Sequence, residues 1–155
     1  MYTRILVPVD GSAASARGLD EAIELARHLK ARMRLVHVVE PWVMVSPETT
    51  AATLHQVAEN IRSVGASLLK ECEHKVANAG IEVDAELIET FGGSAGECIV
   101  RKAKEVDADL IVCGTHGRRG IRRVLMGSDA EYIVRRAPAP VLLVRNQESA
   151  AGEAA

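Results

Sequence analysis

The sequence predicts an open, doubly wound α/β domain in which a five-stranded parallel sheet carries helices on both faces. Short, β-branched apolar runs alternate along the chain with longer segments whose apolar residues recur at helical spacing. The resulting order, β-α-β-α-β-α-β-α-β, implies repeated crossovers between buried strands, which are typical of a parallel sheet. The 155 residues are enough for one domain, since a chain of this size hides about 70% of its unfolded surface.

The first half of the chain is predicted to contain two strands and two helices. Residues 3–9 (TRILVPV) form a β-branched run that ends at the turn DGS, as a buried strand does. A helix is expected from Ser12 to Lys30, and a second strand at residues 33–39 (MRLVHVV). Two prolines in residues 40–50 indicate a loop, and the long helix after it stops at residues 78–80 (NAG). The residues expected to face the core from these helices are Ala16, Leu19, Ile23, Ala26 and Leu29, then Leu54, Val57, Ile61, Val64, Leu68, Cys72 and Val76.

The second half is predicted to add three strands and two helices. Residues 81–89 (IEVDAELIE) alternate apolar and polar side chains, which is typical of a strand near the margin of a sheet. Ser94 and Glu97 have the spacing of a capping box, which predicts the start of the third helix. The other expected elements are strands at 109–113 (DLIVC) and 140–144 (PVLLV) and a helix at 129–137, with Ile99, Ala103, Val106, Ala130, Ile133, Val134 and Ala137 facing inward.

Composition and charge restrict the function classes. Hydrophobic residues make up 48% of the chain and aromatic residues only 3%, so the core is expected to be aliphatic. The net charge of -2 does not favour binding to nucleic acid or to an anionic membrane, because such proteins usually carry a basic excess. Any basic site is therefore expected to be local.

The cysteines and the two ends of the chain indicate a single cytoplasmic domain. Cys72, Cys98 and Cys113 are 26 and 15 residues apart, which matches neither a disulfide framework nor paired metal ligands, so buried thiols are expected. The segment before Asp10 has too few apolar residues for a signal peptide or a membrane span. We expect one domain over residues 1–146 and a flexible tail over residues 147–155.

Residues 114–128 (GTHGRRGIRRVLMGS) have the features of an anion-binding loop. The segment follows an apolar strand, and Ser128 lies where the next helix begins. Gly114 and Gly117 are able to take positive φ and to let main-chain N–H groups approach a ligand. The free N–H groups and positive dipole end of a helix favour phosphate, and Arg118 adds a forked donor. The alternative that the residues leave open is a surface loop with solvated arginines.

The glycine spacing decides which nucleotide-binding family the chain resembles. Neither G-x-G-x-x-G nor G-x-x-x-x-G-K-[ST] occurs, which excludes a dinucleotide-binding Rossmann domain and a P-loop enzyme. Gly114-x2-Gly117, nine residues and then Gly127-Ser128 match the G-x2-G-x9-G-[ST] motif without a gap. With ILVPVDGS, LVHVVEP and PVLLVR, the chain therefore resembles the ATP-binding universal stress proteins over nearly all of residues 1–145.

This resemblance implies a fold, a site and an assembly. The implied strand order is 3-2-1-4-5, with ATP (or ADP or AMP) and Mg²⁺ at the point where the order reverses. It also implies a homodimer through the last strand, Val141 to Arg145. The nucleotide-binding residues carried over from the family are Pro8, Val9 and Asp10, Val38, and Gly114, Thr115, His116, Gly117, Arg118, Gly127 and Ser128, followed by Asp129 and Ala130.

Several of these residues have a second interpretation. Asp10 is expected near the ribose or a phosphate-bound Mg²⁺, yet an Asp before Gly also stabilises a turn by itself. His116 is expected to donate to phosphate, whereas His37 is expected to be a satisfied histidine of the core or sheet edge. Asp129 departs from the family, in which valine is common after the G-[ST] pair. Its carboxylate suits the helix dipole but repels a triphosphate unless a metal ion intervenes.

The sequence thus predicts a nucleotide-dependent regulatory or stress-response protein with slow or no ATP hydrolysis. It offers no positioned general base, so at most a weak ATPase is expected. The first alternative is an RNA-binding module, because the G-x-x-G loop and its arginines resemble a KH loop. A KH loop joins two helices, however, and nucleic acid is not the expected partner. The second alternative is a family member that does not bind nucleotide.

Overall fold

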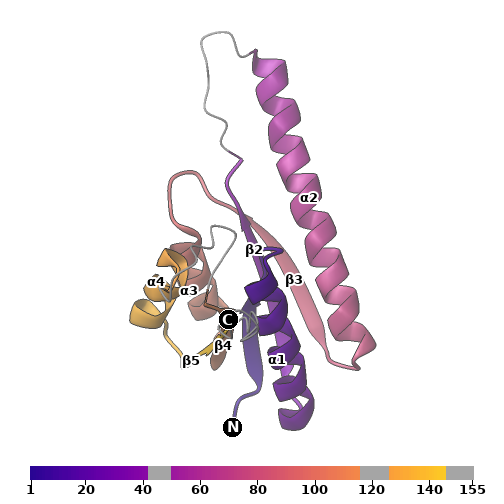
Figure 1. Ribbon diagram of the computed structural model, residues 1–155, viewed down its shortest axis with the longest axis vertical. Helices are drawn as coiled ribbons and strands as arrows, with labels where there is room; N and C mark the ends of the chain where they lie inside the picture. Colours follow the sequence, from indigo (N-terminus) through magenta and orange to yellow (C-terminus); the bar gives the residue numbers. More distant parts are fainter. Residues whose placement is uncertain (42–49, 116–125, 146–155) are drawn as a thin grey trace, which may run out of the picture.

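The structure is a computed structural model and describes residues 1–41, 50–115 and 126–145. It confirms the predicted fold class, because one parallel sheet has the order β3-β2-β1-β4-β5 and four helices cover it (Figure 1). The elements in chain order are β1 (Arg4–Pro8), α1 (Ala13–Leu29), β2 (Arg32–Val39), α2 (Ala51–Asn78), β3 (Val83–Glu89), α3 (Ala95–Glu105), β4 (Leu110–Gly114), α4 (Ser128–Arg136) and β5 (Val141–Val144). The tail predicted to be flexible lies outside the described residues.

Alternating side chains of the sheet build two separate cores. In β1, Ile5 and Val7 pack with α1 and α2 on one face, while Leu6 packs with α3 and α4 on the other. Figure 1 shows the two pairs of helices on opposite sides of the sheet. Both cores are almost entirely aliphatic, as the low aromatic content predicts.

The helix starts predicted at Ser12 and Ser94 are confirmed, and α2 begins at a similar cap. The hydroxyl of Ser12 accepts the Ser15 N–H at the start of α1, and that of Thr50 accepts the Thr53 N–H at the start of α2. Ser94 and Glu97 form the complete capping box of α3. Each of these hydroxyls satisfies one of the N–H groups that a helix leaves unpaired in its first turn.

The predicted inward faces of the helices are wrong at three positions. Ala16, Val64 and Val134 are exposed, and Val64 keeps 61% of its surface. Small residues take their places: Gly18 in α1 and Gly65 in α2 are buried against the sheet. A pattern that counts large apolar residues misses such faces, because glycine lets a helix approach a sheet closely without adding hydrophobic area.

The middle of α2 is tied to the sheet by an ion pair. Arg62 Nε donates to Glu89 Oε1 at 2.6 Å, and its Nη1 donates to Glu59 Oε1. Hydrogen bonds to these two carboxylates raise the pKa of Arg62, while the bond from Arg62 lowers the pKa of Glu89. The pair therefore fixes α2 beside the carboxyl half of β3.

The three cysteines are unpaired, as the spacing in the sequence predicts. Cys72, Cys98 and Cys113 are all free thiols, and burial raises the pKa of Cys113 to about 11. A thiol that stays protonated at neutral pH is a poor nucleophile. No helix in the described ranges has both the length and the apolar character that crossing a membrane requires.

Candidate functional site

The strand order reverses between β1 and β4, whose carboxyl ends lie side by side. Ile5 and Leu6 of β1 pair with Leu110 and Ile111 of β4, while the connections from the two strands run to opposite faces of the sheet. In open α/β sheets ligands bind at this position, because the diverging loops leave a crevice there. Pro8 ends β1 and Gly114 ends β4, so both sequence-predicted loops begin at the reversal.

The turn after β1 is held by a set of short hydrogen bonds. The Val9 N–H donates to the Val36 carbonyl at 2.8 Å, which extends the pairing of β1 with β2. The Asp10 N–H donates to Ser15 Oγ at 3.1 Å, and Asp10 Oδ1 accepts the Ser12 N–H at 2.8 Å. Asp10 therefore forms the turn, as one of its two interpretations predicted. These bonds present the main chain of residues 8–10 at the reversal in one conformation.

The loop after β4 is closed at its base. The Thr115 N–H donates to the Val144 carbonyl at 3.0 Å, and the Gly127 N–H donates to the Thr115 carbonyl at 2.9 Å. The two glycine ends of the motif are thereby brought together, with α4 beginning at Ser128. His116, Gly117 and Arg118 lie outside the described residues.

The start of α4 differs from the other three helix starts. Its N-cap is Gly127, which has no side chain to accept the N–H groups of the first turn. An unpaired helix N-terminus attracts anions, and this one faces the base of the glycine loop. The glycine loop connects strand β4 to helix α4, whereas a KH loop joins two helices.

Gly114 is required for packing, which the sequence reasoning did not foresee. A Cβ atom on Gly114 would lie 2.6 Å from the Ala14 carbonyl carbon and oxygen in the first turn of α1. Gly114 does not have the positive φ that the motif suggested; in the described residues only Gly11, Gly80 and Gly92 among glycines do. The end of β4 and the start of α1 therefore touch through main-chain atoms.

The carboxylate of Asp129 is engaged by α3. Asp129 Oδ1 accepts the Gly96 N–H at 2.8 Å. Gly96 makes this contact possible, since a Cβ there would lie 3.0 Å from the Asp129 carbonyl oxygen and 3.1 Å from Tyr132 Cβ. The role of Gly96 was not predicted from the sequence. The available signal was a glycine between Ser94 and Glu97 of the capping box. Asp129 thus joins the N-termini of α3 and α4.

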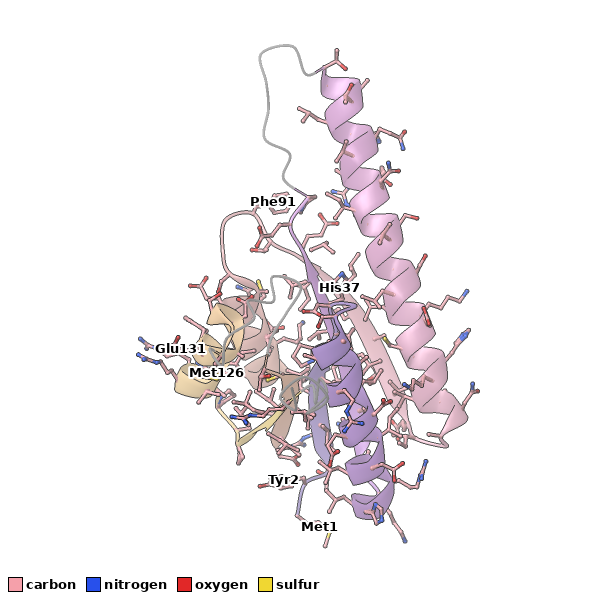
Figure 2. The ribbon with its side chains drawn as sticks, in the orientation of Figure 1. Met1, Tyr2, His37, Phe91, Met126 and Glu131 are labelled. Carbon is pink, nitrogen blue, oxygen red and sulfur yellow. The ribbon has the colours of Figure 1, made fainter. Side chains whose placement is uncertain are left out.

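The two β2 residues singled out in the sequence lie on opposite faces of the sheet. Val38 is half-buried against the α3 and α4 core, and the buried Ala130 of α4 belongs to the same side. His37 is 4% exposed on the other face, between the sheet and α2 (Figure 2). Its Nδ1 lies 2.7 Å from the Val9 carbonyl oxygen, so the predicted satisfied histidine is confirmed.

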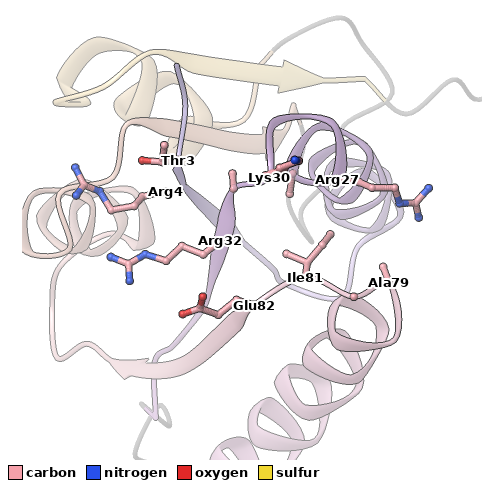
Figure 3. A pocket seen from close by; sticks show the side chains of 11 residues that line it. Thr3, Arg4, Arg27, Lys30, Arg32, Ala79, Ile81 and Glu82 are labelled. Carbon is pink, nitrogen blue, oxygen red and sulfur yellow. The ribbon is translucent and has the colours of Figure 1, made fainter.

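A second cavity lies at the amino ends of β1 and β2. It measures about 490 Å³, and its lining includes four cationic side chains, Arg4, Arg27, Lys30 and Arg32, together with the carboxylate of Glu82. Figure 3 shows Arg4 and Arg27 directed away from each other. Arg4 Nε donates to the Asp107 carbonyl, and Arg27 pairs with Glu24. The carboxyl ends of α1 and α2, which disfavour anions, also lie here. We therefore place the candidate site at the strand reversal.

Known proteins match most of the chain. Residues 1–145 match the model of the universal stress protein family. The chain belongs to this family. A putative universal stress protein of Staphylococcus saprophyticus is 34% identical over 147 residues, which cover 95% of this chain and 86% of that protein. The solved universal stress protein UspA of Lactobacillus plantarum has a TM-score of 0.80 at 28% identity, covering 93% of this chain and 98% of that one.

Two solved universal stress proteins were determined with adenine nucleotides. One is in complex with cAMP and has a TM-score of 0.68 at 26% identity, covering 92% of this chain and 97% of that one. The other, from Archaeoglobus fulgidus, is in complex with dAMP and has a TM-score of 0.62 at 26% identity, covering 92% of this chain and 98% of that one. Both ligands carry adenine and a single phosphate group.

The contact at Gly114 predicts a strong effect on stability in this universal stress protein. Gly114→Ala should lower the free energy of unfolding by about 3 kcal/mol, because the new methyl group collides with main-chain atoms that only a shift of α1 can move. Urea denaturation followed by circular dichroism measures the change.

Gly18→Ala adds a methyl group to the other side of the same contact. Its Cβ would lie 3.2 Å from the Gly114 nitrogen, and the gain in helix propensity of about 1 kcal/mol offsets much of the crowding. The two variants should therefore differ clearly in stability. Equal stabilities would contradict the assigned role of Gly114.

Proposed function

We propose that the chain is a universal stress protein of the ATP-binding type, which holds an adenine nucleotide at the reversal between β1 and β4. The observation that carries the proposal is the placement of the G-x2-G-x9-G-S spacing. Its first glycine ends β4, and its last two residues begin α4 at the reversal. The complexes of relatives with cAMP and dAMP support adenine nucleotides as the ligand class.

In the proposed site each segment has a distinct role. The main chain of residues 8–10 and the strand residue Val38 face the adenosine, and the Val9–Ser12 turn is already ordered by its own hydrogen bonds. The motif residues from Gly114 to Gly117, with Arg118, surround the phosphates together with Gly127 and Ser128. The helix dipole of α4 adds a favourable field for a negative group at its N-terminus.

Mg²⁺ fits this site as an ion carried by the nucleotide. Within residues 1–41, 50–115 and 126–145, no three His, Cys, Asp or Glu side chains are grouped to hold a metal ion. Asp10 accepts the Ser12 N–H through Oδ1, which places its carboxylate at the strand reversal. Mg²⁺ usually takes one or two carboxylates together with substrate phosphates, and Asp10 would supply such a carboxylate.

The proposed role is regulatory and not metabolic. The carboxylate at the reversal, Asp10, holds a turn, an arrangement that suits a binding scaffold more than a proton acceptor for an attacking water. Slow or absent hydrolysis makes the nucleotide a ligand whose occupancy changes binding to a partner or to a second copy. The stress response of this protein would then depend on the nucleotide bound.

The binding of nucleotide is tested on the purified protein. Denaturation followed by mass spectrometry should release an adenine nucleotide, and calorimetric titration with Mg-ATP and AMP should show saturable binding. Gly117→Val should abolish that binding while the circular dichroism spectrum stays that of the wild type, because only the glycine loop is altered. Failure of ATP, ADP and AMP to bind at millimolar concentration would overturn the proposal.

Asp129 is predicted to influence the choice between ATP and AMP. Asp129→Asn removes the charge but keeps an oxygen that accepts the Gly96 N–H. Repulsion grows with the charge of the ligand, so without Mg²⁺ this variant should gain about threefold in affinity for ATP relative to AMP. Calorimetry with both nucleotides measures the ratio.

Asp129→Leu is the matched control, since it removes the acceptor as well as the charge. Leaving the buried Gly96 N–H without its acceptor should lower the free energy of unfolding by about 1–3 kcal/mol, whereas Asp129→Asn should stay near the wild-type value. An unchanged ratio of ATP to AMP affinity in Asp129→Asn would show that this carboxylate has no part in selecting the ligand.

We also propose that two copies pair through β5, the segment from Val141 to Arg145. β5 is the last strand of the sheet. The Pro140 carbonyl accepts the Ile111 N–H of β4, and the Val144 carbonyl accepts the N–H of Thr115 just after β4. By the alternation of a strand, Val141 and Leu143 therefore direct their main-chain polar groups toward the sheet edge. An edge of this kind pairs readily with another copy of itself.

Leu143→Pro should convert the dimer to a monomer. Proline removes an N–H that points away from β4, and edge strands tolerate this loss. Size-exclusion chromatography with light scattering gives the mass. Leu143→Thr keeps the N–H and should remain dimeric. A dimeric proline variant would place the dimer contact on another surface.

A further inference from the structure

We propose that His37 is a positioning residue for the nucleotide site: it fixes the Val9 carbonyl and thereby the turn that the adenosine contacts. This inference rests on the proposed function, because the turn matters for binding only if the nucleotide lies at the strand reversal. The role is distinct from that of a ligand, since His37 lies on the sheet face that packs against α2.

The short contact between His37 and Val9 determines where a ring proton resides. Nδ1 of His37 lies 2.7 Å from the Val9 carbonyl oxygen, and both residues are almost completely buried. A carbonyl oxygen only accepts, so Nδ1 must carry the proton and donate it. This side-chain bond therefore spans β2 and the end of β1.

The His37 bond acts on a turn that other hydrogen bonds already hold. The Val9 N–H already pairs with the Val36 carbonyl, so the His37 bond holds the second main-chain polar group of the same residue. The next residue, Asp10, binds Ser15 and Ser12 at the start of α1. With both main-chain polar groups of Val9 held by β2, the direction in which the chain enters this turn is set.

The other side of the His37 ring is set by α2. A Cβ atom on Gly65 would lie 2.9 Å from His37 Cδ2, so the absence of a side chain at Gly65 is what admits the ring. A cavity of about 230 Å³ adjoins the ring and is lined on the α2 side by Val57, Asn60, Ile61 and Val64. The imidazole thus lies between Gly65 of α2 and the Val9 carbonyl.

Two substitutions at this position separate the hydrogen bond from the bulk of the ring. In His37→Asn, the amide nitrogen occupies the place of Nδ1 and is able to donate to Val9. In His37→Leu, a side chain of similar branching has no donor. AMP and Mg-ATP affinities measured by calorimetry should fall about tenfold for His37→Leu, while His37→Asn should stay within about twofold of the wild type.

A stability control distinguishes positioning from general loosening of the core. Val76→Ala, near the opposite end of α2, removes fully buried methyl groups and should lower the melting temperature. Its nucleotide affinity should equal that of the wild type. A comparable loss of affinity in Val76→Ala, or equal losses in His37→Asn and His37→Leu, would overturn the proposal.

NMR of the nucleotide-free protein tests the role of His37 independently of the proposed nucleotide binding. Nitrogen-15 NMR of the imidazole should show a protonated Nδ1 in the wild type, and the amide signals of Val9 and Asp10 should shift in His37→Leu but not in His37→Asn. If these results hold while no adenine nucleotide binds the wild type, the proposed function is wrong and the positioning of the turn stands. An unprotonated Nδ1 overturns the positioning itself.

Discussion

The main-chain contact between Gly114 and the first turn of α1 sets the geometry of the whole carboxyl edge of the sheet. A methyl group at this position would lie 2.6 Å from Ala14, so the end of β4 and the start of α1 are in contact without intervening side chains. This contact brings the β1–α1 turn and the glycine loop to the same place. Gly114 is therefore needed for packing whether or not a ligand binds.

Much of the fold was predictable because the strands are short, apolar and regularly spaced. The strand residues Ile5 to Val7 and Ile111 to Cys113 have no interpretation other than buried strands, and Ser12 and Ser94 mark helix starts by their spacing alone. The faces of the helices were less predictable. Gly18 and Gly65 are buried where the helices come closest to the sheet, and no scale of side-chain hydrophobicity ranks glycine as a core residue.

The candidate site was predictable to the extent that it depends on local spacing. Pro8, Gly114 and Ser128 lie at the ends of their elements as the motif implies, because each end is encoded within a few residues. The contacts of Asp129 with Gly96 and of His37 with Val9 join residues 33 and 28 positions apart. Such partners are set by the packing of helices and strands, which local sequence does not reveal.

At the start of α4, the order of the helix end is coupled to the binding of an anion. Ser12, Thr50 and Ser94 each accept one N–H group in the first turn of α1, α2 and α3, so the chain itself supplies a cap there. Gly127 has no side chain to supply such a cap, and a bound anion at this end would accept the N–H groups of the first turn of α4. Any anion that binds there stabilises the ordered helix end in proportion to the logarithm of its concentration. The order of this helix end would then rise with the concentration of the bound anion.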